Sequence, residues 1–392
     1  MFDAKRFLNK KIFINILETM VLAAVACLTI SEFGGYYLIS TTVGTHSKLL
    51  MEIAFSLFAI KIMLTRYTKK EFLTVFVLIF LGYINYKRSG NTEIITSAVM
   101  ILSLKNVSLK KVFTVCFYSL IGIVALLGIL SVLGIAGDLS ITKDFGRGGV
   151  ETRYVFGFYH PNQWAHAVFM ILLCGMLSFW ERMDWKCGAA MLVVNLVIYK
   201  LAASRTAFLC GMVLILMMLL YKHCAYVVKS KTWNRLLVAG CAAVWMFSLY
   251  LVKNSAGVFW NKLDRLFTGR ISLGREFMTI YSPTVWGEKI ADMLENGHVL
   301  DFGYIRFFLE NGVIIYGLMI AATFLIGIYA VNKGRYEILV VLASITLYGI
   351  YENIAMRMTP ANMIMVFFSL MIYERGFFSE VSKKALTIEK IT

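Results

Sequence analysis

Long apolar runs dominate this sequence and restrict the folds that it can adopt. A helix that crosses a bilayer needs roughly 20 mostly apolar residues, and about twelve runs approach or reach that length. Hydrophobic residues make up 59% of the 392-residue chain and charged residues 16%, against about 45–50% and about 25% in soluble proteins. The sequence therefore predicts an all-α, polytopic integral membrane protein with about twelve transmembrane helices. The approximate ranges of the runs are 12–30, 49–65, 71–86, 92–106, 112–136, 163–181, 185–201, 204–222, 234–252, 312–331, 335–354 and 360–376.

Basic residues lie in short clusters on alternate connections between the runs. Such clusters precede the first run, follow the second, fourth, sixth, eighth and tenth, and end the chain. Cytoplasmic loops carry the excess of Lys and Arg in membrane proteins. Twelve spans would therefore place all these clusters and both termini in the cytoplasm. This pattern accounts for the net charge of +16, so we do not infer nucleic-acid binding from that charge.

The opposite side of the membrane receives the two longest polar connections, 137–162 and 254–311, and all three prolines. The chain divides into a membrane bundle of predicted spans 1–9 (1–253), one large outer loop (254–311), and predicted spans 10–12 with a cytoplasmic tail (312–392). A hydrophobic protein has no packing need for so polar an insert. We therefore expect the functional site on this outer side.

The first outer segment of interest precedes the sixth run and reads RYVFGFYHPN from Arg153 to Asn162. A helix N-cap at Asn162, an entry angle set by Pro161 and an interfacial belt of aromatic residues would explain most of it. These roles leave the positive charges and the histidine unexplained, including Arg147 in the preceding Gly–Arg–Gly triplet. Arg153 is therefore a candidate substrate ligand and His160 a candidate catalytic group.

Arg205 begins the eighth run, directly after Ser204, which suits a helix N-cap. A cation in the first turn faces the positive end of the helix dipole, which is unfavourable. Snorkelling to lipid phosphates is one explanation for this arginine. The other is that Arg205 and the free helix N–H groups together bind a substrate phosphate. We favour the phosphate site.

The large loop contributes two further arginines. The spacing of Phe259, Leu263 and Phe267 predicts a short amphipathic helix in the headgroup plane. Gly269–Arg270 and Gly274–Arg275 follow, and their glycines argue against one continuous helix. Arginine beside a flexible backbone suits bidentate binding of phosphate, whereas a loop resting on anionic lipid would use lysine as well. Both arginines are therefore predicted pyrophosphate ligands.

The loop ends in the segment HVLDFGYIRFFLENG, which starts at His298 and leads into the tenth run. Arg306 and Glu310 are spaced as an i, i+4 ion pair on a helix. Asn311–Gly312 can separate this helix from the span. Asp301 can cap the helix, but a carboxylate in a low-dielectric cleft is also a candidate general base.

The positions of the cysteines argue against disulfides in the loop and against a bound metal ion. None of the seven cysteines lies there, and the chain has no CxxC and no Cys/His cluster at metal-ligand spacing. We therefore expect neither disulfides in the loop nor a protein-bound metal. The basic start of the chain leads into an apolar run without a small-residue cleavage site, which indicates a first span rather than a signal peptide.

These motifs, in this order on one membrane face, resemble those of Wzy-type polysaccharide polymerases in the superfamily of O-antigen polymerases and ligases. The resemblance covers residues 140–330 or so, with only the general hydropathy plan outside that range. Its motifs are R-x-x-F-G-F-x-H-P-N from Arg153, Ser204–Thr206, Gly269–Arg270, Trp286–Gly287 and D-F-G-Y-I-R-F-F-L-E-N-G from Asp301.

The resemblance implies a glycosyltransferase in the bacterial cytoplasmic (inner) membrane with its active site on the extracytoplasmic side. Such an enzyme joins undecaprenyl-pyrophosphate-linked oligosaccharide repeat units into surface polysaccharide, whether capsule, exopolysaccharide or O-antigen. Its partners would be these lipid-linked oligosaccharides, membrane lipids, and a chain-length regulator and flippase of the same pathway. No cofactor is expected, because arginines can neutralise a diphosphate leaving group without a metal ion.

The resemblance also suggests roles for individual residues. Arg205 and Arg270, or Arg275, would hold the diphosphate, and the general base would be Asp301, His160 or His298, in that order. Ligases have a histidine where this chain has Asp301, ahead of the tyrosine matched by Tyr304, and this difference favours a polymerase. The full set of substrate-binding candidates is Arg153, Arg205, Arg270, Arg275, Tyr304 and Arg306.

Two alternatives remain from the sequence. One is a ligase-type glycan transferase. The other is a flippase or transporter for a lipid-linked glycan, which would also need outer arginines. A transporter predicts internal repeats and polar groups in mid-membrane. The sequence has no evident repeat and few charges inside its runs, Lys61 and Glu18 among them.

Overall fold

The computed structural model describes residues 2–35, 43–145, 149–254, 258–266, 269–295, 297–353 and 363–374. Four predicted features lie outside these ranges: the triplet at 146–148, Phe267, the connection between the last two predicted runs (355–359) and the C-terminal basic cluster from residue 375. The elements are α1 (Phe2–Gly35), α2 (Val43–Met63), α3 (Lys69–Ser89), α4 (Glu93–Ser103), α5 (Leu109–Val132), β1 (Ser140–Asp144), β2 (Val150–Tyr154), α6 (Pro161–Ser178), the 3-10 helix η1 (Trp180–Arg182), α7 (Trp185–Ala202), α8 (Arg205–His223), α9 (Ala225–Lys229), α10 (Lys231–Lys253), α11 (Val258–Leu266), α12 (Arg270–Ile280), α13 (Gly303–Lys333), α14 (Tyr336–Tyr351) and α15 (Met363–Tyr373).

Each predicted apolar run overlaps one helix of the structure. Within the described residues, six helices are long and apolar enough to cross a membrane, and two shorter helices, Glu93–Ser103 and Tyr336–Tyr351, are also apolar. The protein is therefore a helical, multi-pass membrane protein, while the count of twelve spans stays a prediction. The six segments are Ile12–Gly34, Leu109–Val132, Trp185–Ala202, Arg205–His223, Lys231–Lys253 and Gly303–Lys333.

Large apolar side chains face outward along the bundle, as lipid contact requires. On α3, Phe72, Phe76 and Phe80 recur every fourth residue and are 58%, 54% and 54% exposed. A monomeric soluble protein rarely exposes a contiguous apolar patch of this kind. The outward face of α3 is therefore suited to a bilayer rather than to water.

Aromatic packing joins α10 to the start of α13 inside the bundle. Trp245 on α10 is fully buried, and its ring lies edge-on to Tyr304 and Tyr316 of α13, with centroids 4.7 and 5.2 Å apart. The Tyr316 hydroxyl donates a hydrogen bond to the Trp245 carbonyl oxygen at 2.6 Å. This packing fixes the N-terminal part of α13 against α10.

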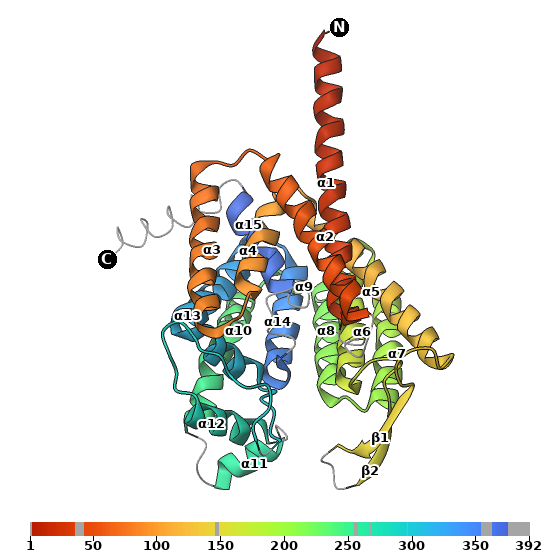
Figure 1. Ribbon diagram of the computed structural model, residues 1–392, viewed down its shortest axis with the longest axis vertical. Helices are drawn as coiled ribbons and strands as arrows, with labels where there is room; N and C mark the ends of the chain where they lie inside the picture. Colours follow the sequence, from red (N-terminus) through yellow and green to blue (C-terminus); the bar gives the residue numbers. More distant parts are fainter. Residues whose placement is uncertain are drawn as a thin grey trace.

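The described parts of the two longest polar connections lie at one end of the bundle. Figure 1 shows α11, α12 and the β1–β2 hairpin at the same end, opposite the N-terminus. We call this the loop end, comprising residues 137–145, 149–160, 258–266, 269–295 and 297–302. The antiparallel hairpin, which pairs Ser140 with Tyr154 and Asp144 with Val150, was absent from the all-α prediction. Its β-branched Ile, Thr and Val residues favour a strand over a helix.

A tight backbone contact anchors the long loop to α13. Gly312 has φ 76° and ψ 175° inside α13, which confirms the predicted break between the loop-end helix and the span. Gly287 also has a positive φ of 80°, and a Cβ there would lie 2.1 Å from the Glu310 carbonyl oxygen. The Asn85 side-chain amide of α3 donates to the carbonyl oxygens of Trp286 (3.0 Å) and Glu310 (2.8 Å). The loop, α3 and α13 are thus held together.

Helix α12 corrects the expectation that glycines would interrupt the segment carrying the two arginines. It runs unbroken from Arg270 to Ile280, with Gly274 inside it. A Cβ on Gly274 would meet a Val252 methyl carbon at 3.0 Å and Phe302 at 3.5 Å. This glycine is therefore present for close packing against α10 and the start of α13, and tertiary contact outweighs its low helix propensity.

Candidate functional site

Arg270 is positioned by the junction between α11 and α12. Gly269 has φ 79° and ψ 6°, a left-handed conformation that lets the chain turn sharply before α12. From α11, the Asp264 carboxylate accepts hydrogen bonds from the backbone N–H groups of Ile271 (2.9 Å) and Ser272 (3.2 Å). These bonds satisfy N–H groups that a helix start otherwise leaves unpaired, so Arg270 is held as the first residue of α12.

The Arg270 guanidinium lies against the end of α14. Its Nε donates to the Tyr351 carbonyl oxygen at 2.6 Å, and one terminal nitrogen lies 3.2 Å from Glu352 Oε1. The same nitrogen is 3.8 Å from Asp301 Oδ2. A cation at a helix C-terminus is favourably placed with respect to the helix dipole. The large loop is thereby tied to α14 through one largely buried arginine.

Glu352 joins three parts of the fold. Its Oε1 also accepts a hydrogen bond from the Asn162 side-chain amide at 2.8 Å, so α6, α12 and α14 meet at one carboxyl group. Burial of the carboxyl, and then the negative charge of Asp301, raise the pKa of Glu352 to about 8, against the opposing effect of Arg270. This carboxyl therefore keeps its proton to a higher pH than an ordinary glutamate does, and Asp301 is the second carboxyl beside Arg270.

Asp301 presents a second carboxylate to the same arginine. It lies just before α13, whose N-cap is Phe302, so Asp301 does not cap the helix. Its side chain is 47% exposed, so it can meet a substrate. Desolvation raises the pKa of Asp301, although Arg270 and Arg306 pull it down. A carboxylate with a raised pKa is a stronger base than an ordinary aspartate.

His160 caps helix α6, and this corrects the expectation that Asn162 would do so. The His160 Nδ1 accepts a hydrogen bond from the Asn162 backbone N–H at 3.2 Å, and Pro161 occupies the first helical turn. Burial, with the positive charges of Lys143 and Arg153, lowers the pKa of His160 to about 4. The imidazole is therefore neutral at physiological pH and a weak base, and its Asn162 neighbour reaches Glu352.

Arg153 holds the hairpin against the start of α6. It is buried, pairs with Glu151 on the same strand, and lies with its guanidinium carbon 3.9 Å from the Phe145 ring centroid. The Phe145 ring in turn lies 6.0 Å from the His160 ring, edge-on. In this arrangement the charge of Arg153 is already met by a carboxylate and an aromatic face.

Arg306 lies two turns before the kink in α13. Its Nε donates to Glu310 at 2.8 Å, which confirms the predicted i, i+4 pair. A terminal nitrogen also pairs with Asp292, an exposed residue of the long loop. Arg306 thus links the loop to α13, within electrostatic range of Asp301.

His298 and Arg275 lie against other elements of the loop end. His298 Nδ1 is 2.7 Å from Glu276 on α12, and a carboxylate at this distance can orient an imidazole. Arg275, half-buried one turn and a half beyond Arg270, has its Nε 3.5 Å from the Val252 carbonyl oxygen at the end of α10.

Arg205 and Tyr304 have opposite exposures. Arg205 is exposed as the first residue of α8, and within the described residues no carboxylate pairs with its guanidinium. Ser204 is at the N-cap position, but its buried hydroxyl has no hydrogen-bond partner in the described part of the chain. Tyr304 is fully buried, and its hydroxyl donates to the Thr346 carbonyl oxygen at 2.8 Å, so it packs the bundle rather than reaching a ligand.

We use the name Glu352 cluster for Asn162, Arg270, Asp301 and Glu352. Of the predicted site residues, Arg270 and Asp301 meet in it directly, and His160 adjoins it through Asn162. Sequence reasoning missed Glu352, because the predicted span 335–354 enclosed it. An acidic residue near the end of an apolar run was the available signal.

Comparison of the chain with protein-family models, curated proteins and solved structures finds no match. Among the residues that the structure describes, no three His, Cys, Asp or Glu side chains form a metal-binding group. The family resemblance therefore rests on the sequence motifs alone, and the activity that it implies is a proposal.

Proposed function

We propose that this protein is a membrane-embedded polymerase that joins oligosaccharide units carried on undecaprenyl pyrophosphate. The observation that carries the proposal is the Glu352 cluster at the loop end. There Arg270 lies 3.2 Å from Glu352, whose pKa is raised by burial, and 3.8 Å from the half-exposed Asp301. A cation for a leaving diphosphate and a carboxylate for an incoming hydroxyl are what glycosyl transfer from a lipid diphosphate needs.

The proposed reaction moves the growing saccharide from its lipid diphosphate to a sugar hydroxyl of a new lipid-linked unit. The bond from the anomeric carbon to the phosphate oxygen breaks, and a bond from that carbon to the acceptor oxygen forms. Asp301 takes the acceptor proton. The lipid diphosphate leaves as an anion, with its charge stabilised by Arg270.

The position of α8 supports a second cation near the diphosphate. Helix α6 starts beside Glu352, α7 returns along it, and α8 packs against both α7 and α14, so α8 begins at the loop end. Arg205 is exposed there, next to free N–H groups of the first helical turn. Helix N-termini with an adjacent arginine bind phosphate readily.

The test compares the length of polysaccharide made by variants of the full chain. Arg270→Ala and Asp301→Asn should each abolish long polymer while single repeat units still reach the cell surface, and Arg205→Ala should shorten the polymer. Arg335→Ala is the matched control, because Arg335 also pairs with a carboxylate, Glu337, but lies at the opposite end of α14. Normal chain lengths in Arg270→Ala and Asp301→Asn would refute the proposal.

The same experiment separates the alternative functions. In a flippase, the Arg270→Ala variant would keep single repeat units from reaching the surface. In a ligase-type transferase, long polymer would form but would not be attached to its final acceptor. A single cysteine placed at residue 270 tests the proposed extracytoplasmic side. An impermeant thiol reagent added outside intact cells should modify it. Labelling only from the cytoplasm would rule that side out.

A further inference from the structure

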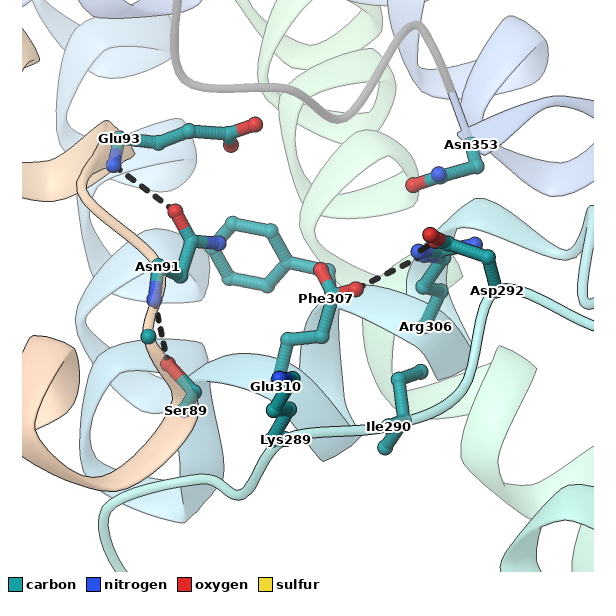
Figure 2. Close-up of a pocket in the computed structure, with 11 residues that line it drawn as sticks. Ser89, Asn91, Glu93, Lys289, Ile290, Asp292, Arg306, Phe307, Glu310 and Asn353 are labelled. Carbon is teal, nitrogen blue, oxygen red and sulfur yellow. Dashed lines mark hydrogen bonds and ion pairs between the residues drawn. The ribbon is translucent and has the colours of Figure 1, made fainter.

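A polar cavity of about 240 Å³ lies at the loop end, between the α3–α4 turn, the long loop and the first turns of α13. Figure 2 shows Asn91 and Glu93 on one side of it and Asp292, Arg306 and Asn353 on the other. The side-chain oxygen of Asn91 accepts the backbone N–H of Glu93 at 2.8 Å, which leaves its amide NH₂ group as a donor.

The cavity adjoins the Glu352 cluster. Asn353 follows Glu352 in the chain, and Figure 2 shows its side chain directed toward the cavity. Arg306, on the same cavity wall, is near enough to Asp301 to lower the pKa of that carboxyl. An occupant of the cavity would therefore lie beside the carboxylate that the proposed reaction uses.

The charges around the cavity favour some ligands over others. Three carboxylates (Glu93, Asp292 and Glu310) and two cations (Lys289 and Arg306) line it. Arg306 is already paired with two of those carboxylates. The cavity therefore has no spare buried cation for an anionic ligand, and its excess of carboxylates repels one.

The remaining lining suits a polyhydroxylated ring. Carboxylates accept hydrogen bonds from hydroxyl groups, and side-chain amides both donate and accept them. The buried Phe307 and Ile290 add apolar surface for the carbon skeleton. Sites for drug-sized molecules occupy about 300–1,000 Å³, so this smaller cavity fits a single sugar ring.

We propose that this cavity is a saccharide subsite that takes one neutral or amino-sugar unit and disfavours acidic sugars. The proposal rests on the proposed function, since it assigns the site a place in binding the lipid-linked saccharide. It identifies a class of sugar, which Arg270 and the rest of the Glu352 cluster do not.

The experiment measures sugar binding directly. Saturation-transfer NMR on the full chain in lipid nanodiscs is recorded with glucose, glucosamine and glucuronate as separate probes. Glucose and glucosamine should bind saturably, with glucuronate at least about fivefold weaker, which corresponds to about 1 kcal/mol. Absence of saturable binding by both glucose and glucosamine would overturn the proposal, as would equal binding of glucuronate.

Two charge-reversal variants on the same loop sharpen the result. Asp292→Lys changes the formal charge of the lining from one excess carboxylate to one excess cation, so it should shift the preference toward glucuronate by about fivefold or more. Glu295→Lys makes the same change at an exposed residue outside the lining and should leave the preference unchanged. Identical preferences in the two variants would refute a cavity-based site.

The Arg270→Ala variant keeps the two proposals separable. It should retain sugar binding, because Arg270 does not line the cavity. Failed sugar binding together with loss of polymer in Arg270→Ala would overturn the subsite alone. Intact sugar binding together with normal polymer in Arg270→Ala would overturn the polymerase mechanism.

Discussion

Replacement of Glu352 by Gln should make the protein more stable at alkaline pH. Burial raises the pKa of Glu352 from the usual 4.5 to about 8. Between these values the unfolded chain has lost the proton while the folded chain keeps it, so the folded state binds more protons and stability falls as pH rises. Below 4.5 both states are protonated, and above about 8 the full penalty of a buried carboxylate is present.

The size of the effect follows from the same two values. The difference of about 3.5, at about 1.36 kcal/mol for each pKa unit, sets an upper limit of about 5 kcal/mol at high pH. Gln keeps a carbonyl oxygen for the Asn162 amide but cannot ionise. The variant should therefore match the wild type below about pH 4.5, exceed it increasingly between about pH 5 and 8, and keep a constant advantage at higher pH.

The assay is thermal unfolding of the purified chain in detergent, followed by intrinsic fluorescence across the range from acidic to alkaline pH. The wild-type Tm should fall as pH rises toward 9, while the Glu352→Gln curve stays flatter and ends several degrees higher. Glu337→Gln, at the other end of α14, is the matched control for the loss of a carboxyl group and should not reproduce the gain in Tm at alkaline pH. Parallel curves for wild type and Glu352→Gln, or a variant that is less stable at alkaline pH, would refute the assignment of a protonated, buried Glu352.

Three further substitutions test the structural roles assigned above. Tyr304→Phe removes the hydrogen bond to Thr346 and should lower the free energy of unfolding by about 1 kcal/mol while polymer length is retained. Loss of polymer at unchanged stability would instead indicate a role in binding substrate. Gly312→Ala should lower the free energy of unfolding by about 1–3 kcal/mol or more, and so lower Tm, because φ is positive and the new Cβ would lie 2.3 Å from the Gly287 nitrogen. A fully stable variant would contradict the close backbone contact. His160→Ala removes the N-cap of α6 and should lower the free energy of unfolding by about 0.5–2 kcal/mol, whereas His160→Asn can still cap the helix and should keep most of the wild-type Tm. An Asn variant no more stable than the Ala variant would argue against the capping role.

Local features of this protein follow from its sequence because they depend on neighbouring residues. The Arg306–Glu310 pair needs only a helix that brings residues four apart together. The break at Gly312 needs only a glycine that tolerates a positive φ. Pro161 in the first turn of α6 is likewise a local preference, although the cap itself came from His160 rather than Asn162.

Predictions failed where distant contacts outweighed local preference. Gly274 lies inside an unbroken α12 because the helix packs too closely against Val252 for a larger residue. Tyr304 matches a motif that suggests substrate contact, and packing against Trp245 buries its side chain, so that role stays a prediction for the Tyr304→Phe variant to test. No local rule reports what a helix surface meets in the folded chain, so the sequence pattern could not decide either case.

The sequence by itself determined the membrane class, the order of the helices and the arginine-rich character of the long loop, because apolar length and composition act along the chain. Only the tertiary structure decided which charges meet. Arg270 and Glu352 are separated by 81 intervening positions, and Asn162 joins the same carboxyl from 190 residues away. The raised pKa of Glu352 arises from that shared burial, which exists only when α6, α12 and α14 come together at the loop end.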